Sequence, residues 1–179
     1  MGFFSPAPYH ILSYGTLLGT TVFQTFINGT IAFRVLPRPQ FGALMAAVFP
    51  VYFALQAGLP AALALTFPGS RSPSGAPGGL AGLLHPSNRW AALAPLAGAL
   101  ACAVGNLVVV GPETTRVMEE RRQQERKDGK KAYDAPPHSK EMQELNRRFS
   151  MLHGISSLLN LGTLAATVVY GITLSSRLS

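Results

Sequence analysis

The chain has 179 residues, of which 47% are hydrophobic and 13% are charged, and its formal net charge is +7. Soluble domains carry roughly 25% charged residues, so this composition argues against an ordinary soluble protein and indicates a membrane protein. All eight acidic residues and ten of the fifteen basic residues lie between residues 113 and 148. Because this basic segment is nearly as rich in acids and has no nucleic-acid-binding motif, we expect no nucleic-acid partner.

Four apolar stretches follow one another along the chain. Each has the roughly 20 residues needed to cross about 30 Å of hydrocarbon, and each lacks charge. Their ranges are Ile11 to Phe33, Ala43 to Phe67, Trp90 to Val110, and Ser150 to Leu174. The sequence therefore predicts an all-α integral membrane protein, with one four-helix transmembrane bundle over residues 1–179.

The connections between these stretches differ in composition. The first, "RVLPRPQ", is short and predicts an antiparallel pair of helices, whereas residues 68–89 are rich in Pro, Gly and Ser and predict a flexible loop. The third, residues 112–149, is charged. It predicts a helix from Pro112 to Gly129, a break at Pro136 and Pro137, and a second helix from Ser139 into the fourth span.

Charge spacing supports the first of these two helices. Oppositely charged residues three or four apart face each other on a helix, and three such pairs are present: Glu113 with Arg116, Glu119 with Arg122, and Arg121 with Glu125. We expect the two helices to form a charged hairpin that stands off the membrane.

The distribution of basic residues predicts the orientation. The first and third connections lie on one side and hold twelve of the fifteen Lys and Arg residues. The positive-inside rule places that side, and with it the charged hairpin, in the cytosol, and both termini on the opposite side. An endomembrane and a mitochondrial membrane are both compatible with the sequence.

Polar residues occur at two depths inside the predicted spans. At 1.5 Å per residue, Asn28, Asn106 and His153 lie about 5–8 Å from the cytosolic ends of their helices. A deeper group lies about 14–20 Å in and consists of Gln24, Gln56 and Asn160. On the fourth span, Ser157 shares a face with His153 and Asn160. These residues predict a polar seam inside the bundle.

The seam has two interpretations. Its side chains either hydrogen-bond the helices to one another or line a polar pathway. The absence of an intramembrane carboxylate favours hydrogen bonding between the helices. At the cytosolic mouth, Glu113 is placed to form an ion pair with Arg34 or Arg148. We expect no metal or cofactor, because His10 and His153 lie at opposite ends of the bundle. We expect no enzymatic activity, because the carboxylates lie in or beside the solvated hairpin.

Four motifs together resemble the transmembrane protein 205 family, also described as a domain of unknown function. They are "TFINGTIAFRVLPRPQFG", "FPVYF", "NLVVVGPETTRVM" and "RRFSMLHGISSLLNLG". The resemblance covers nearly the whole chain except residues 68–89, which look long in the manner of fungal members. It implies a multi-span membrane protein without established enzymatic activity, and it supplies no catalytic or binding residues.

Two functions remain open from the sequence. The first is a structural or interaction protein, such as an accessory subunit of a membrane complex or a trafficking factor. The second is a small transporter or channel that uses the polar seam. Either role implies membrane lipids as partners, together with other membrane protein subunits or self-association.

Overall fold

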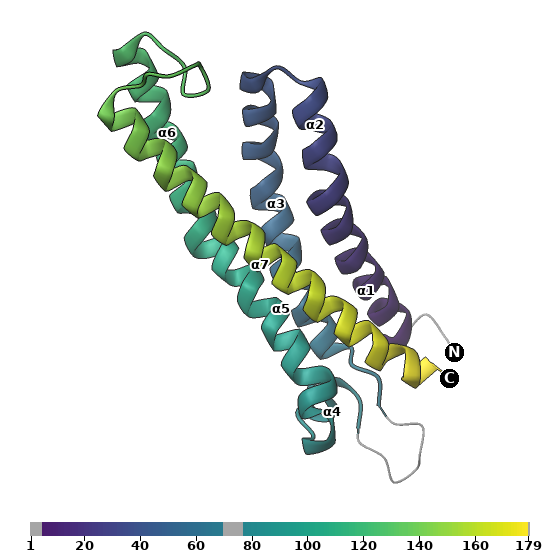
Figure 1. Ribbon diagram of the computed structural model, residues 1–179. Helices are drawn as coiled ribbons and strands as arrows, with labels where there is room; N and C mark the ends of the chain where they lie inside the picture. Colours follow the sequence, from purple (N-terminus) through teal and green to yellow (C-terminus); the bar gives the residue numbers. More distant parts are fainter. Residues whose placement is uncertain (1–4, 70–76, 179) are drawn as a thin grey trace.

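The computed structural model describes residues 5–69 and 77–178, and every regular element within these ranges is a helix (Figure 1). The all-α part of the prediction is therefore confirmed for the described residues.

The chain begins with one long helix in three parts, followed by a tight turn. The parts are α1 (Pro6–Val22), the π-helical turn η1 (Phe23–Asn28) and α2 (Gly29–Val35). Leu36 then adopts an extended conformation, with φ −101° and ψ 140°. The residue before a proline avoids the helical region, so Pro37 ends this helix, and the next one, α3 (Arg38–Leu65), runs back beside it.

The segment after α3 differs from the flexible loop predicted over residues 68–89. It contains α4 (Gly79–Leu83) and the 3₁₀ turn η2 (Pro86–Asn88), while residues 70–76 lie outside the described residues. Asn88 is buried, and its amide donates a hydrogen bond to the Gly82 carbonyl at 2.7 Å. This contact fixes part of the segment, and the Pro/Gly/Ser composition gives no sign of it.

A second long helix follows in four parts. They are η3 (Arg89–Leu93), α5 (Ala94–Gly105), η4 (Asn106–Val110) and α6 (Gly111–Asp128). The apolar third stretch and the first helix of the charged connector thus form one continuous helix.

The charged connector folds back on itself after α6. Gly129 ends α6 in the left-handed conformation, with φ 63°, which glycine adopts without steric cost. The last helix, α7 (Lys140–Leu178), follows Ser139, whose side chain accepts a hydrogen bond from the Met142 N–H at 3.2 Å. Both helices of the predicted hairpin are present, and α6 packs against α7 (Figure 1).

Three helices are long and apolar enough to cross a membrane. They are α3, the continuous helix Pro86–Asp128, and α7 as far as Arg177. The first helix, residues 6–35, is not among them. It carries Gln24, Asn28 and five threonines, which make it less apolar than the other three. The expected membrane protein is thus supported by three of the four predicted spans.

The four long helices nevertheless pack as a ring. The first helix lies beside α3 and α7, and α5 also lies beside α3 and α7. At one end of the ring, shown at the lower right of Figure 1, the first helix begins close to the end of α7.

The exterior of these helices is rich in large apolar side chains, unlike that of a soluble protein, while the interior is mostly apolar and also holds several polar side chains. Large apolar side chains face outward, among them Phe23 (53% exposed) and Leu158 (70%). Polar side chains lie inside, with Thr21, Gln56 and Asn106 fully buried. Lipid can cover the apolar exterior, and polar groups that avoid lipid must pair between the helices.

Candidate functional site

The first polar contact joins η4 and α7. Asn106 is fully buried, and its amide nitrogen donates to the Asn160 side-chain oxygen at 3.3 Å and to the Ser156 carbonyl at 3.4 Å. Both bonds are long. Both residues belong to the predicted polar seam, but the sequence assigned them to different depths and did not predict this contact.

The second polar contact joins the first helix and α3. Gln56 is fully buried, and its amide nitrogen donates to the Tyr52 hydroxyl at 2.7 Å and to the Thr21 hydroxyl at 3.2 Å. Gln24 and Asn28 lie farther along the first helix. They bond to each other at 2.7 Å, from the Asn28 amide nitrogen to the Gln24 side-chain oxygen, one turn apart on the same helix.

The predicted single seam is therefore divided. One polar group lies between the first helix and α3, and the other lies between η4 and α7. The structure does not bring Asn28 to Asn106 as the depth argument predicts, because depth along a helix does not determine which helices are neighbours.

His153 and Ser157 do not reach either group. His153 is exposed and stacks on Phe149, with ring centroids 6.1 Å apart, and Ser157 donates to the His153 carbonyl at 2.8 Å. The buried side chains of α7 lie along one face of the helix, the buried line, which includes Leu152 and Thr163. Successive residues are 100° apart around a helix, so His153, one position beyond Leu152, points away from the interior.

π-helical turns, which the sequence did not indicate, contain three of the predicted polar residues. Gln24 and Asn28 lie in η1, and Asn106 begins η4. The wide turn η4 closes where the Gly111 N–H bonds to the Asn106 carbonyl. A Cβ atom on Gly111 would lie 2.7 Å from that carbonyl oxygen, so glycine is required there for the turn that presents Asn106. Such turns are frequent at functional sites.

The predicted cytosolic mouth contains a cluster of ion pairs. The Arg148 guanidinium of α7 lies 3.0 Å from Glu113 and 3.3 Å from Glu120 of α6, and Arg116 lies 2.6 Å from Glu113. Of the two arginines predicted to pair with Glu113, Arg148 does so. Arg34 is exposed and forms no ion pair within the described part of the chain.

This cluster predicts a pH dependence. Hydrogen bonds from Arg116 and then Arg148, with their positive charges, hold the pKa of Glu113 below its ordinary value of 4.5. Because the pKa of Glu113 is lower in the folded than in the unfolded protein, the ionised carboxylate stabilises the fold. This contribution is complete above about pH 4.5 and is lost as the pH falls through the folded-state pKa. We expect Glu113→Gln to lower the melting temperature in detergent at pH 7 and to have a shrinking effect below pH 4.5. The same effect at all pH values would contradict this. Glu141→Gln, in the exposed first turn of α7, is the control.

Other predicted pairs along α6 have mixed outcomes. Glu119 and Arg122 form an ion pair at 3.5 Å, as predicted. No ion pair between Arg121 and Glu125 is present. Glu125 instead accepts from the Ala132 N–H at 2.9 Å and lies 3.4 Å from the Lys131 amine.

A buried histidine for which the sequence predicted no partner joins three segments at the opposite end. His10 Nδ1 lies 2.9 Å from the Thr66 hydroxyl, and Nε2 lies 2.7 Å from the Tyr170 hydroxyl. The Thr66 hydroxyl donates to the Ala62 carbonyl at 2.7 Å, so it accepts from the Nδ1–H of His10. Nε2 then accepts from Tyr170. The beginning of the first helix is thus fixed beside the ends of α3 and α7.

No cluster of three or more His, Cys, Asp or Glu residues that could hold a metal ion occurs within residues 5–69 and 77–178.

Comparison with known proteins identifies the family of this chain. A family model described as "Domain of unknown function (DUF4149)" matches residues 12–123, more than half of the chain. The chain belongs to the DUF4149 family. The matched DUF4149 region extends from the first helix into α6, so it includes Gln56, Asn106 and Glu113.

A curated relative matches beyond the DUF4149 region. The chain is 35% identical over 175 residues to "Xanthocillin biosynthesis cluster protein D" of Aspergillus fumigatus, which covers 96% of this chain and 90% of the relative. No solved structure matches the chain.

Proposed function

We propose that this DUF4149 protein is a four-span membrane protein that acts as a non-enzymatic accessory or interaction subunit beside other membrane proteins. In this proposal the first helix crosses the membrane together with the three more apolar helices. The hairpin of α6 and α7 faces the cytosol, as the positive-inside rule predicts. The motif resemblance to the transmembrane protein 205 family supports a multi-span membrane protein.

The main support is the pairing of buried polar side chains within the bundle. Asn106 bonds to α7, and Gln56 bonds to Tyr52 and to the first helix. Amides that bind one another hold helices together and do not need a transported ligand. His153, the only titratable side chain predicted in the seam, faces outward.

The relative's printed name associates that protein with a biosynthesis cluster. For the present chain we propose a comparable setting, in which a membrane protein accompanies biosynthetic enzymes without catalysing a step. The exposed charges of α6 provide a surface for a partner. Glu119 and Arg126 are 51% and 74% exposed at their side chains.

The accessory role predicts a defined partner. We expect the tagged chain, solubilised gently from its native membranes, to co-purify with another membrane protein at a fixed ratio by native mass spectrometry. The double variant Glu119→Gln and Arg126→Gln should lose that partner without a change in melting temperature. Ser87→Ala, at the opposite end, should keep it. A monodisperse chain without a partner would contradict the accessory role.

A transporter is the second candidate, and one observation favours it. The side-chain oxygens of Gln56 and Asn106 are buried and have no hydrogen-bond partner in the part of the chain that the structure describes. Unpaired buried acceptors are costly, and a water molecule or a passing polar ligand would satisfy them.

Flux through reconstituted vesicles separates the two candidates. If the oxygens serve a pathway, Asn106→Leu and Gln56→Leu should abolish flux of a small polar solute in vesicles, while the exposed variant Leu158→Ala leaves it intact. If the Gln56 and Asn106 side chains only hold the helices together, no flux is present and the same variants only lower thermal stability.

A further inference from the structure

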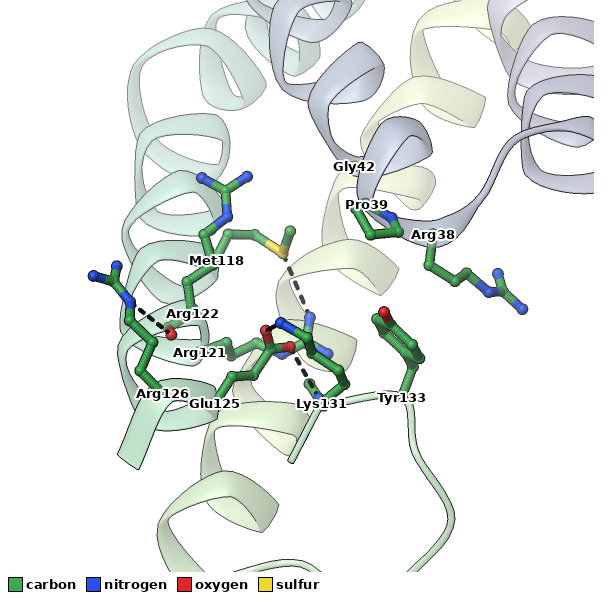
Figure 2. Close-up of a pocket in the computed structure, with 11 residues that line it drawn as sticks. Arg38, Pro39, Gly42, Met118, Arg121, Arg122, Glu125, Arg126, Lys131 and Tyr133 are labelled. Atoms are coloured by element: carbon green, nitrogen blue, oxygen red, sulfur yellow. Dashed lines mark hydrogen bonds and ion pairs between the residues drawn. The ribbon is translucent and has the colours of Figure 1, made fainter. Parts of the chain in front are cut away.

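A pocket of about 420 Å³ lies where α3 begins and where the chain turns back after α6 (Figure 2). Its size is within the range of small-molecule sites. Three separate segments form it: the start of α3, one face of α6, and residues 131–133. Its charged lining consists of five basic side chains and one carboxylate: Arg38, Arg121, Arg122, Arg126, Lys131 and Glu125.

The single carboxylate is already engaged. One Glu125 oxygen accepts from the Ala132 N–H at 2.9 Å, and the other lies 3.4 Å from the Lys131 amine. Its charge therefore serves to hold the turn after α6. Arg122 and Arg126 pair with Glu119 at 3.5 and 3.7 Å, so the positive charges of the pocket that form no ion pair among the described residues are those of Arg38 and Arg121.

Arg121 is the basic residue at the centre of the pocket. It is half-buried and forms no ion pair within the described residues. Its guanidinium lies 4.5 Å from the centre of the Phe149 ring and donates only to the Met118 sulfur, at 3.4 Å. Its Nε atom is buried and has no hydrogen-bond partner among residues 5–69 and 77–178, and burial lowers the pKa of the guanidinium. A half-buried arginine held only by a weak sulfur acceptor lacks the anion that such a group normally binds.

The other arginines lie around the rim. In Figure 2, the side chains of Arg38, Arg122 and Arg126 extend away from the centre, whereas Arg121, Glu125 and Lys131 converge there. Arg38 stacks on the Phe33 ring at 3.6 Å and forms no ion pair in the described part of the chain. Long flexible side chains at the rim can close on a ligand that enters.

The position of the pocket indicates the kind of anion. Gly42 lines it, and the apolar stretch of α3 begins with the next residue. Exposed apolar side chains flank this part of the chain, with Val35 69% and Leu44 38% exposed. An anion in the pocket would therefore lie at the level where the apolar surface starts, as a lipid phosphate does.

We propose that this pocket binds the phosphate-bearing headgroup of an anionic phospholipid, with the acyl chains along the apolar surface of α3. Arg121 and Lys131 bind the phosphate, and the rim arginines enclose the headgroup. Basic pockets at the cytosolic surface of membrane helices have the charge that such headgroups require. This site goes beyond the proposed accessory role and does not depend on it.

Native mass spectrometry of the full chain, freed of lipid in detergent, tests the proposal. We expect phosphatidylinositol to bind more tightly than phosphatidylcholine with the same acyl chains. Lys131→Gln and Arg121→Gln should each weaken phosphatidylinositol binding about fivefold. Arg147→Gln removes the same charge from an 80% exposed side chain outside the pocket and should leave binding unchanged.

Each other outcome overturns a stated part of the proposal. Equal binding of the two lipids, or an equal loss in Arg147→Gln, would show that the pocket does not select an anion. If glycerophosphoinositol or inorganic phosphate binds as tightly as the lipid, the ligand is a soluble phosphate and the lipid assignment is wrong. Because Lys131 is exposed, its variant keeps the test valid even if Arg121→Gln fails to fold.

Discussion

Gly111→Ala should destabilise the protein by about 1–3 kcal/mol, the usual cost of forcing extra atoms into a packed position. The new methyl group would lie 2.7 Å from the Asn106 carbonyl oxygen, which is backbone and cannot rotate away. The π-helical turn η4 would have to open, and the Asn106 side chain would leave Asn160. The measurement is the free energy of unfolding in detergent, together with the melting temperature.

Gly98→Ala is the matched control for this prediction. Gly98 lies in α5, on the same continuous helix, and an added Cβ would meet nothing within 4 Å. Alanine favours the helix over glycine, so this variant should be neutral or slightly stabilising. If both variants have the same effect, the close approach at Gly111 does not determine the turn.

His10→Phe should have the second large effect, a loss of about 1–3 kcal/mol, because it leaves the buried Tyr170 hydroxyl without its acceptor. His10 is 1% exposed and joins the beginning of the first helix to the ends of α3 and α7. The free energy of unfolding in detergent again measures the effect. Tyr9→Phe, at a 55% exposed position, is the control and should change little.

A double variant separates the hydrogen bond from the packing. His10→Phe combined with Tyr170→Phe removes both partners, so no hydroxyl stays buried without a bond, and part of the lost stability should return. Additive losses in the two single variants would instead mean that His10 acts through its volume.

The parts of the fold that the sequence predicts well are those with a local physical cause. Pro37 determines the turn between the first helix and α3, Gly129 ends α6, and Ser139 caps α7. Uncharged stretches of about 20 residues predict the three helices that are long and apolar enough to cross a membrane, and charges three residues apart predict the pairs of α6, such as Glu119 with Arg122. Each signal lies within a few residues of the element that it predicts.

The site was harder to predict because it depends on which helices are neighbours. Depth alone groups Asn28, Asn106 and His153, yet the ring of helices separates Asn28 from Asn106. His153 faces outward because it lies one residue from the buried line of α7. The π-helical turns rotate polar residues by an amount that ideal helix spacing does not include. The contacts of His10 were not predicted because its partners Thr66 and Tyr170 are 56 and 160 residues away.

The central claim is that the first helix crosses the membrane although it is less apolar than the other three. Labelling of single cysteines with a membrane-impermeant maleimide tests it most directly, in sealed vesicles of known orientation and in a Cys102→Ser background. We predict that Tyr9→Cys and Ser175→Cys react from the same side and that Lys127→Cys reacts from the opposite side. If Tyr9→Cys reacted from the same side as Lys127→Cys, the first helix would not cross, and the four-span account would be contradicted.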